Sequence, residues 1–263
     1  MEANFSKVRP KKFLGQHFLT DMSVANRIAD TVDACPSLPI LEVGPGTGVL
    51  TQFLLRKGRE LKVVEIDRES VPYLKNHFPA LADNIIEGDF LRMQLDKTFG
   101  GQPFVLTGNY PYNISSQIFF KMLDYKDLIP CCTGMIQKEV AERMAAAPGS
   151  KTYGVLSVLI QAWYDVEYLF TVDEHVFNPP PKVKSAVVCL RRNGKQQLGC
   201  DERLFRRIVK TVFTMRRKML RNGMKQIVGS DSPILAMPIM SRRPEQLSVD
   251  EYVELTNRVA ASV

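Results

Sequence analysis

The chain has 263 residues, of which 45% are hydrophobic and 24% are charged, which is the composition of an ordinary folded protein. No apolar run is long enough to cross a bilayer, and the five cysteines and three histidines show neither a pairing rhythm nor metal-ligand spacing. These features exclude a membrane-spanning chain, a disulfide framework and a metal site, and we expect a cytoplasmic protein.

The net charge of +7 is concentrated at the two ends of the chain. Residues 1–12 carry a surplus of 3 positive charges and residues 191–263 a surplus of 8, whereas the middle sums to −4. Segregated positive charge favours a polyanionic partner that both ends contact, although solvated basic tails would give the same pattern.

Short apolar runs alternate with helical patterns along the middle of the chain. The predicted strands lie at 39–44, 61–67, 84–89, 103–109 and 132–137, and the predicted helices at 49–58, 71–78, 115–123, 140–146 and 153–163. Two further strands, at 165–172 and 185–192, leave no room for a crossover helix and should be antiparallel. The pattern predicts an α/β fold with a doubly wound, mostly parallel sheet that has an antiparallel end.

The rhythm changes after residue 199, where the remaining chain has helical periodicity. A helix is expected over 201–228 with an interruption at Gly223, and its apolar stripe comprises Phe205, Ile208, Val209, Val212 and Phe213. A last helical segment covers 244–262. We therefore expect two domains, residues 1–194 with the sheet and the basic N-terminal segment, and residues 195–263 as a small helical domain.

Gly44, Gly46 and Gly48 follow the first strand and precede a helix, where glycines permit close backbone approach to a ligand. A dinucleotide fingerprint would need a third glycine at position 49, which is Val49. The spacing therefore favours a cofactor without a pyrophosphate, against a plain strand-to-helix turn and against an NAD-dependent oxidoreductase.

Acidic residues end the next two strands. Glu65 is placed to accept hydrogen bonds from two ribose hydroxyls, and Asp89 to accept one from an adenine amino group. The glycine turn at the first strand end and one acid at each of the next two fit S-adenosylmethionine better than a dinucleotide.

The fourth strand ends in Asn109-Tyr110-Pro111-Tyr112, beside the expected reactive end of that cofactor. The side-chain oxygen of Asn109 and the carbonyl of Tyr110 are acceptors for the two N–H groups of an exocyclic base amine, whose lone pair they would turn toward the methyl donor. Pro111 stiffens the backbone, and Tyr112 can stack on a base withdrawn from its helix.

Several long segments together resemble the small-subunit ribosomal RNA adenine dimethyltransferases (KsgA type) along nearly the whole chain. The matching segments are "KKFLGQHFL", "LEVGPGTGVLT", "VVEID", "EGDF", "GNYPYNISS", "VFNPPPKVKSAV" and "FTMRRKMLRN". The resemblance implies a class I S-adenosylmethionine methyltransferase (Rossmann-like) fold with seven strands and a C-terminal helical domain. It also implies dimethylation of two adjacent adenines near the 3′ end of the small-subunit rRNA, by a monomer acting on the immature small subunit.

The resemblance also assigns residues to the site. The implied cofactor contacts are His17, Leu19, Gly44, Glu65, Asp89 and Asn109, with Gly46 in the same turn. Phe177 would cover the face of the adenine opposite Tyr112. The expected RNA contacts are Lys7, Arg9, Lys11, Lys12, Arg216, Arg217, Lys218 and Arg221. The family often has Asn at the place of His17 and Leu at the place of Tyr110, whose side chain the sequence leaves unexplained.

Two alternatives stay open at this stage. One is an adenine methyltransferase of the large-subunit rRNA, from which the tail and the "VFNPPPKVKSAV" segment differ. The other is a ribosome-assembly or transcription factor that keeps the fold without methylating, against which the intact Asn109–Tyr112 segment argues.

Overall fold

The computed structural model describes residues 8–262 and divides into two compact units. The first contains the residues up to Ala141 together with Glu167–Arg192, and the second contains Glu142–Val166 together with the residues from Asn193 onward. The division predicted at residue 194 places Glu142–Val166 with the sheet, whereas here this segment groups with the C-terminal helices. The reason is that its helix α6 (Val155–Gln161) packs against α7 (Glu202–Phe213) and α9 (Val249–Ala260) of the second unit.

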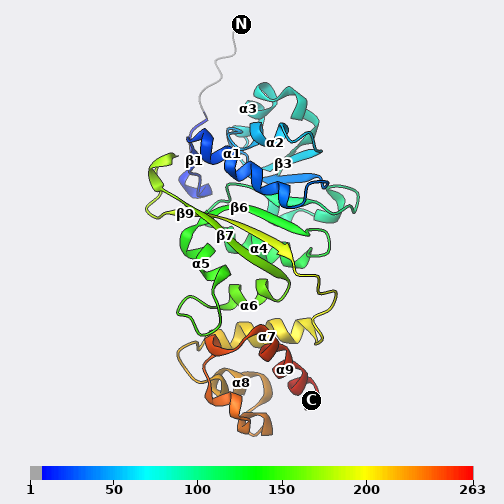
Figure 1. Cartoon of the computed structure of the whole chain (residues 1–263), viewed down its shortest axis with the longest axis vertical. Coiled ribbons are helices and arrows are strands. Elements are labelled where there is room, and N and C mark those ends of the chain that lie inside the picture. The colour runs from blue at the N-terminus through cyan, green and yellow to red at the C-terminus, as the bar shows by residue number, and fades with distance from the viewer. Residues whose placement is uncertain (1–7, 263) are drawn as a thin grey trace. The chain divides into compact units, whose positions relative to one another are not determined.

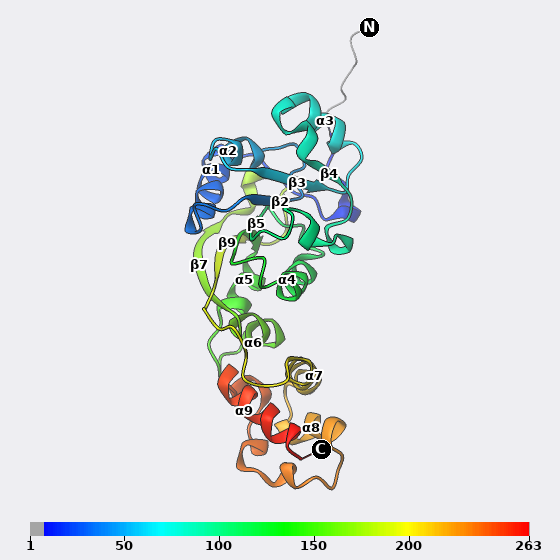
Figure 2. The ribbon, with the colours of Figure 1, turned by 90° about the vertical axis from the view of Figure 1, so that its right-hand side faces the viewer.

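The main sheet consists of β2 (Ile40–Val43), β3 (Leu61–Glu65), β4 (Ile85–Glu87), β5 (Val105–Thr107), β6 (Cys131–Gln137), β7 (Tyr164–Val172) and β9 (Ser185–Arg192). The strand order of this seven-stranded sheet is β4-β3-β2-β5-β6-β9-β7; Figure 1 labels β3, β6, β7 and β9, and Figure 2 labels β2, β4 and β5. The strands from β4 to β6 are parallel, and β9 runs antiparallel to β6. The predicted fold class, a mostly parallel sheet with an antiparallel end, is confirmed.

An α-helix follows each of the parallel strands β2, β3, β5 and β6, as the alternation predicts. They are α2 (Thr51–Leu55), α3 (Ser70–His77), α4 (Ser115–Asp124) and α5 (Lys138–Ala145). A helix that the sequence analysis did not predict, α1 (Met22–Asp30), lies beside α2 and packs against β6 (Figure 2). Asp21 begins it by accepting hydrogen bonds from the N–H groups of Ser23 and Val24.

A second, two-stranded sheet brings the N-terminal segment to the proline-rich segment. Strands β1 (Phe18–Leu19) and β8 (Phe177–Asn178) pair antiparallel, with Leu19 opposite Phe177. This pairing, which was not predicted, fixes the residues just before Phe18 next to the carboxyl ends of the main strands.

The second unit contains α6, α7 (Glu202–Phe213), α8 (Leu220–Val228) and α9 (Val249–Ala260). The predicted apolar stripe of α7 is buried, except that Phe213 is only partly covered. The predicted interruption at Gly223 is wrong, because the helix breaks between Phe213 and Leu220 and Gly223 lies inside α8. A Cβ at Gly223 would lie 2.7 Å from the Cα of Val212, so the glycine serves the close packing of α8 on α7.

Candidate functional site

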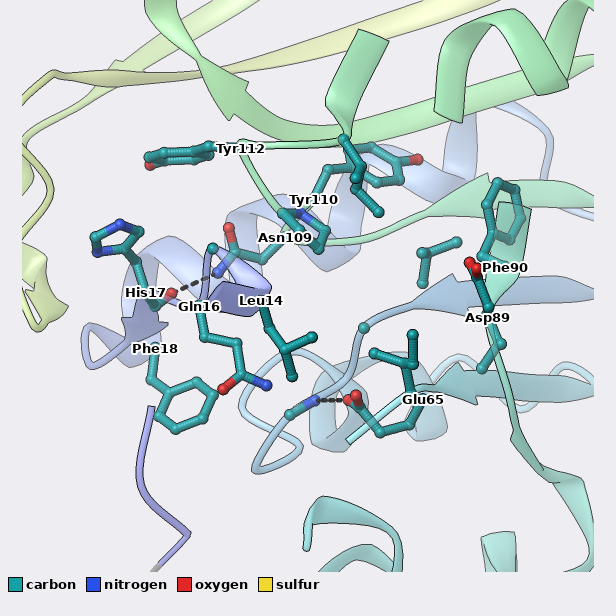
Figure 3. Close-up of a pocket in the computed structure, with 18 of the residues that line it drawn as sticks. Leu14, Gln16, His17, Phe18, Glu65, Asp89, Phe90, Asn109, Tyr110 and Tyr112 are labelled. Atoms are coloured by element: carbon teal, nitrogen blue, oxygen red, sulfur yellow. Dashed lines mark hydrogen bonds between the residues drawn. The ribbon is translucent and has the colours of Figure 1, made fainter. Parts of the chain in front are cut away.

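A cavity lies at the carboxyl ends of β2, β3, β4 and β5 (Figure 3). Parallel strands end at the same edge of a sheet, which is why residues distant in sequence meet there. The predicted site residues that line the cavity are His17, Gly44, Gly46, Glu65, Asp89, Asn109, Tyr110, Pro111 and Tyr112. The N-terminal segment closes one side with residues 14–18.

The glycine turn after β2 forms one wall of the cavity. Gly44 and Gly46 have φ of +69° and +57°, a left-handed conformation that favours glycine. A Cβ at Gly46 would lie 3.0 Å from the ring of Phe18, so a side chain there would narrow the cavity. The turn thus leaves its backbone accessible to a bound molecule.

Glu65, at the end of β3, is only 2% exposed and is oriented by two backbone N–H groups. The N–H of Gly46 donates to Oε2 at 2.9 Å, and the N–H of Asp67 donates to Oε1 at 2.8 Å. Burial raises the pKa of Glu65, while these two hydrogen bonds oppose that rise by favouring the ionised form. Each oxygen keeps a further lone pair, so the carboxylate is oriented to accept two hydroxyl groups.

The lining of the cavity determines which kind of cofactor it fits. Among the described residues that line it there is no Lys or Arg, whereas two carboxylates, Glu65 and Asp89, are present. A pyrophosphate would lack a cationic partner here, but a nucleoside that carries a positive charge is compatible with the acidic lining. The exposed side chain of Ile66 adds an apolar surface next to the carboxylate of Glu65.

Asn109 is held at the end of β5 by a hydrogen bond to the N-terminal segment. Its Nδ2 donates to the carbonyl oxygen of His17 at 3.1 Å (Figure 3). Because the amide nitrogen is engaged in this bond, the orientation of the Oδ1 acceptor is fixed as well.

The side chain of Tyr110 anchors this segment in the core. It is 1% exposed, its N–H donates to the carbonyl of Met135 at 3.0 Å, and its hydroxyl donates to the carbonyl of Thr133 at 2.8 Å. A Cβ at Gly134 would lie 2.7 Å from the ring, and one at Gly108 would lie 3.4 Å from it. The ring therefore occupies a slot between two glycines, which explains how an aromatic residue replaces the usual leucine.

The ring of Tyr112 faces that of His17 across the mouth of the cavity (Figure 3). The ring centroids are 5.3 Å apart at an interplanar angle of 28°, and the Tyr112 hydroxyl is hydrogen-bonded to Ser185. The Nδ1 of His17 lies 2.8 Å from the carbonyl of Pro179 and must donate to it, because a carbonyl only accepts. Both rings are thus held by residues of the segment around β8 and β9.

Two predicted site residues lie outside the cavity lining. Phe177 and Leu19 are each 4% exposed and belong to the apolar core of the first unit. Leu19 also lines a smaller neighbouring hollow together with Glu42 and the glycine turn. The aromatic ring that the structure places opposite Tyr112 is that of His17.

A family profile described as ribosomal RNA adenine dimethylase matches residues 7–260. The chain belongs to the ribosomal RNA adenine dimethylase family. It is 71% identical to the ribosomal RNA small subunit methyltransferase A of Phocaeicola vulgatus, over 97% of this chain and 91% of that protein. The protein of the same name from Bacteroides thetaiotaomicron is 69% identical, over 96% of this chain and 94% of its own length.

Solved structures agree with this assignment. A dimethyladenosine transferase from Plasmodium falciparum superposes with a TM-score of 0.78 at 25% identity, covering 94% of this chain and 98% of that one. The 23S rRNA methyltransferase ErmE superposes with a TM-score of 0.66 at 26% identity, covering 91% and 99%. The resemblance deduced from the motifs is thereby confirmed at the level of the family and of its methyltransferase activity.

Some of the basic residues predicted to contact RNA have their charged groups bound to other protein atoms, and others are exposed. Lys7 lies outside the described residues. The ammonium of Lys11 is ion-paired with Asp67 at 2.5 Å and with Glu69 at 3.0 Å. The guanidinium of Arg216 donates to backbone carbonyls of residues 150 and 151.

The other predicted RNA contacts are exposed at the surface, namely Arg9, Lys12, Arg217, Lys218 and Arg221. Arg217 and Lys218 line a polar hollow of the second unit together with Asn222 and Arg243. A phosphate can reach these exposed side chains, whereas the charged groups of Lys11 and Arg216 are already bound to protein atoms.

Two buried acids near the cavity, neither of which lines it, were not predicted from the sequence. Glu42, in the central strand β2, is 1% exposed and accepts a hydrogen bond from the Thr51 hydroxyl at 2.7 Å. Asp67 is 2% exposed and follows Glu65 by two residues. The signal for Glu42 was an acid inside the apolar run "PILEVG", and the signal for Asp67 was the second acid of "VVEID".

Proposed function

We propose that the chain transfers methyl groups from S-adenosylmethionine to N6 of two adjacent adenines near the 3′ end of small-subunit rRNA, during maturation of the small subunit. The observation that carries the proposal is the fixed amide of Asn109, which stands over a cavity with two carboxylates and no basic lining residue among those described. High identity to small-subunit methyltransferases along the chain supports the choice of substrate.

The cofactor would be held by residues of three strand ends. Glu65 would accept the two ribose hydroxyls, Asp89 the adenine amino group, and the turn containing Gly44 and Gly46 would lie against the remainder of the molecule. The N-terminal segment would add backbone contacts from His17 and from the buried Leu19. When bound, S-adenosylmethionine supplies a methyl group on a positively charged sulfur.

The acceptor amine would be oriented by the Asn109–Tyr112 segment. Asn109 Oδ1 and the Tyr110 carbonyl would each accept one N–H of the adenine amino group, and the same two acceptors would stabilise positive charge that develops on nitrogen. Because Asn109 and Tyr110 are both fixed by hydrogen bonds, these acceptors need little reorganisation. The proton then leaves to water, so no charged base is required.

Tyr112 would stack on one face of the withdrawn adenine. Phe177 was expected to cover the other face, but the imidazole of His17 is the ring across from Tyr112, and Phe177 pairs with Leu19 of β1. The two ring centroids are 5.3 Å apart, which is too close to hold a base between them, so the proposal requires the rings to separate when His17 forms the second aromatic wall.

The exposed cations would bind RNA phosphates, which makes binding sensitive to salt. Arg9 and Lys12 would do so near the N-terminus, and Arg217, Lys218 and Arg221 in the helical unit. We also propose a phosphate contact for Lys7, which lies outside the described residues. We also propose that the chain acts as a monomer in the cytoplasm and that its substrate is a partly assembled small subunit.

The test is transfer of labelled methyl groups at saturating S-adenosylmethionine to small subunits that lack these modifications, with large subunits as the competing substrate. Wild type should label the small subunit, and Asn109→Ala should bind it without labelling it. Label in the large subunit would support the other rRNA methyltransferase class. No label in either subunit would support an assembly factor without activity. Label in the large subunit, or in neither subunit, would overturn the proposal.

A further inference from the structure

The N-terminal segment 11–18 covers one side of the cofactor cavity and is fastened at both of its ends. At the end nearer the acceptor site, the His17 carbonyl accepts from Asn109, and β1 pairs with β8. At the other end, Lys11 reaches the residues that follow β3, and Gln16, next to His17, reaches the same residues. Residues 14–18 line the cavity, and both sets of contacts hold them in place.

The hydrogen bonds from Lys11 and Gln16 both end at Asp67. Its Oδ1 accepts from Lys11 Nζ at 2.5 Å, and its Oδ2 accepts from Gln16 Nε2 at 3.4 Å. Gln16 in turn accepts from the backbone N–H of Lys11 at 2.8 Å, which closes a ring of hydrogen bonds. The N–H of Glu69 and the hydroxyl of Ser70 also donate to the Asp67 carboxylate.

The same residue is connected directly to the predicted ribose-binding carboxylate. The backbone N–H of Asp67 donates to Glu65 Oε1 at 2.8 Å. A shift of Asp67 would therefore move both the N-terminal segment 11–18 and Glu65, although Asp67 itself does not line the cavity.

We propose that Asp67 is a positioning residue for the cofactor site, and that Lys11 holds the N-terminal segment over the bound cofactor by pairing with Asp67. This inference rests on the proposed function for the identity of the cofactor. It gives Lys11 a role different from the RNA contact expected from the sequence.

Burial of the Asp67 carboxylate explains why the pair persists. The side chain of Asp67 is 1% exposed and that of Lys11 is 24% exposed, so a cation is needed to compensate the buried charge. The hydrogen bond to Asp67 raises the pKa of Lys11, and for Asp67 the contacts with Lys11 and Glu69 outweigh burial and lower its pKa, so both groups stay charged near neutral pH. An RNA phosphate would have to displace this pair, whereas the exposed neighbour Lys12 has no such carboxylate partner among the contacts of the described residues.

The test compares Lys11→Met with Lys12→Met in the full chain. Dissociation of S-adenosylmethionine is followed by stopped-flow fluorescence, and the salt dependence of RNA binding is measured with the same proteins. Lys11→Met should speed cofactor dissociation about tenfold with an unchanged salt slope, because an uncompensated buried carboxylate releases the segment. Lys12→Met should leave cofactor dissociation unchanged and lower the salt slope by roughly 0.7, the value for one phosphate contact on a single strand.

Two further variants keep the result interpretable if Lys11→Met is unstable. Lys11→Arg preserves the pair and should restore slow dissociation, while Asp67→Asn should speed dissociation as Lys11→Met does. A lowered salt slope with normal cofactor dissociation in Lys11→Met would overturn the inference and leave the proposed function intact. Failure of the wild-type chain to bind S-adenosylmethionine at all would instead refute the proposed function.

Discussion

Replacement of Glu42 by Gln should change how the stability of the protein depends on pH. Glu42 is fully enclosed in strand β2, and its carboxyl has one hydrogen-bond donor, the hydroxyl of Thr51. Burial raises its pKa from 4.5 to about 8, and the nearby charge of Glu65 contributes in the same direction. Gln has nearly the same shape, can accept the same hydrogen bond from Thr51, and has no proton to lose.

The sign and size of the effect follow from the two pKa values. Because the folded pKa lies above the unfolded one, the folded chain retains a proton that the unfolded chain releases between about pH 4.5 and about pH 8. The stabilisation from this proton is complete below pH 4.5 and is lost as the pH rises through about 8. From pH 5 to pH 8 the free energy of unfolding of the wild type should fall by about 3 kcal/mol through this group.

The assay is urea unfolding of wild type and Glu42→Gln at several pH values from 5 to 8. The stability of the variant relative to wild type should rise by about 3 kcal/mol across this range. The exposed Glu60, replaced by Gln, provides a control with the same chemical substitution at the surface and should give no comparable trend. Parallel pH profiles for wild type and Glu42→Gln would refute the reasoning.

Three further predictions concern the acceptor site, the helical packing and the RNA surface. His17→Asn should lower kcat/KM for the small subunit about tenfold, through loss of ring stacking, without raising the Kd for the cofactor; an equal loss of cofactor affinity would contradict the role as an aromatic wall. Gly223→Ala should lower the free energy of unfolding in urea by roughly 1–2 kcal/mol, because its Cβ would press on Val212, and a more stable variant would contradict this. Joint replacement of Arg217 and Lys218 by Gln should reduce the salt slope of RNA binding by about 1.4 with normal cofactor affinity, and an unchanged slope would exclude both phosphate contacts.

The positions of the main strands along the chain and most of the first unit's helices follow from local pattern. Buried parallel strands such as β2 are apolar along their whole length and end in turn residues, so the run from Ile40 to Val43 is recognisable by itself. Because parallel strands end at one edge, the glycine turn, Glu65, Asp89 and Asn109 were expected to meet, and all of them line one cavity.

Short or weakly patterned elements escaped the sequence analysis. The buried face of α1 consists of Ala25, Ile28 and Ala29, which is too small an apolar stripe to stand out. Strands β1 and β8 have two residues each and carry no period. Gly223 was interpreted as a helix break, whereas its cause is the approach of a neighbouring helix that local sequence does not reveal.

The details of the site depend on contacts between residues far apart in the chain. The pair of Lys11 and Asp67 spans 56 positions, so charge counting could only assign Lys11 to a generic basic segment. The slot for the Tyr110 ring depends on Gly134 in the next strand, which explains why the tyrosine appeared anomalous in its own motif.

The most direct test of the central claim is to map the bases that the protein methylates. Small subunits lacking these modifications are incubated with the protein and S-adenosylmethionine bearing labelled methyl groups, and the rRNA is then digested and analysed by mass spectrometry. The account predicts label on two adjacent adenines near the 3′ end, each carrying two methyl groups on N6. Label confined to another position, or to large-subunit RNA offered in the same reaction, would contradict it.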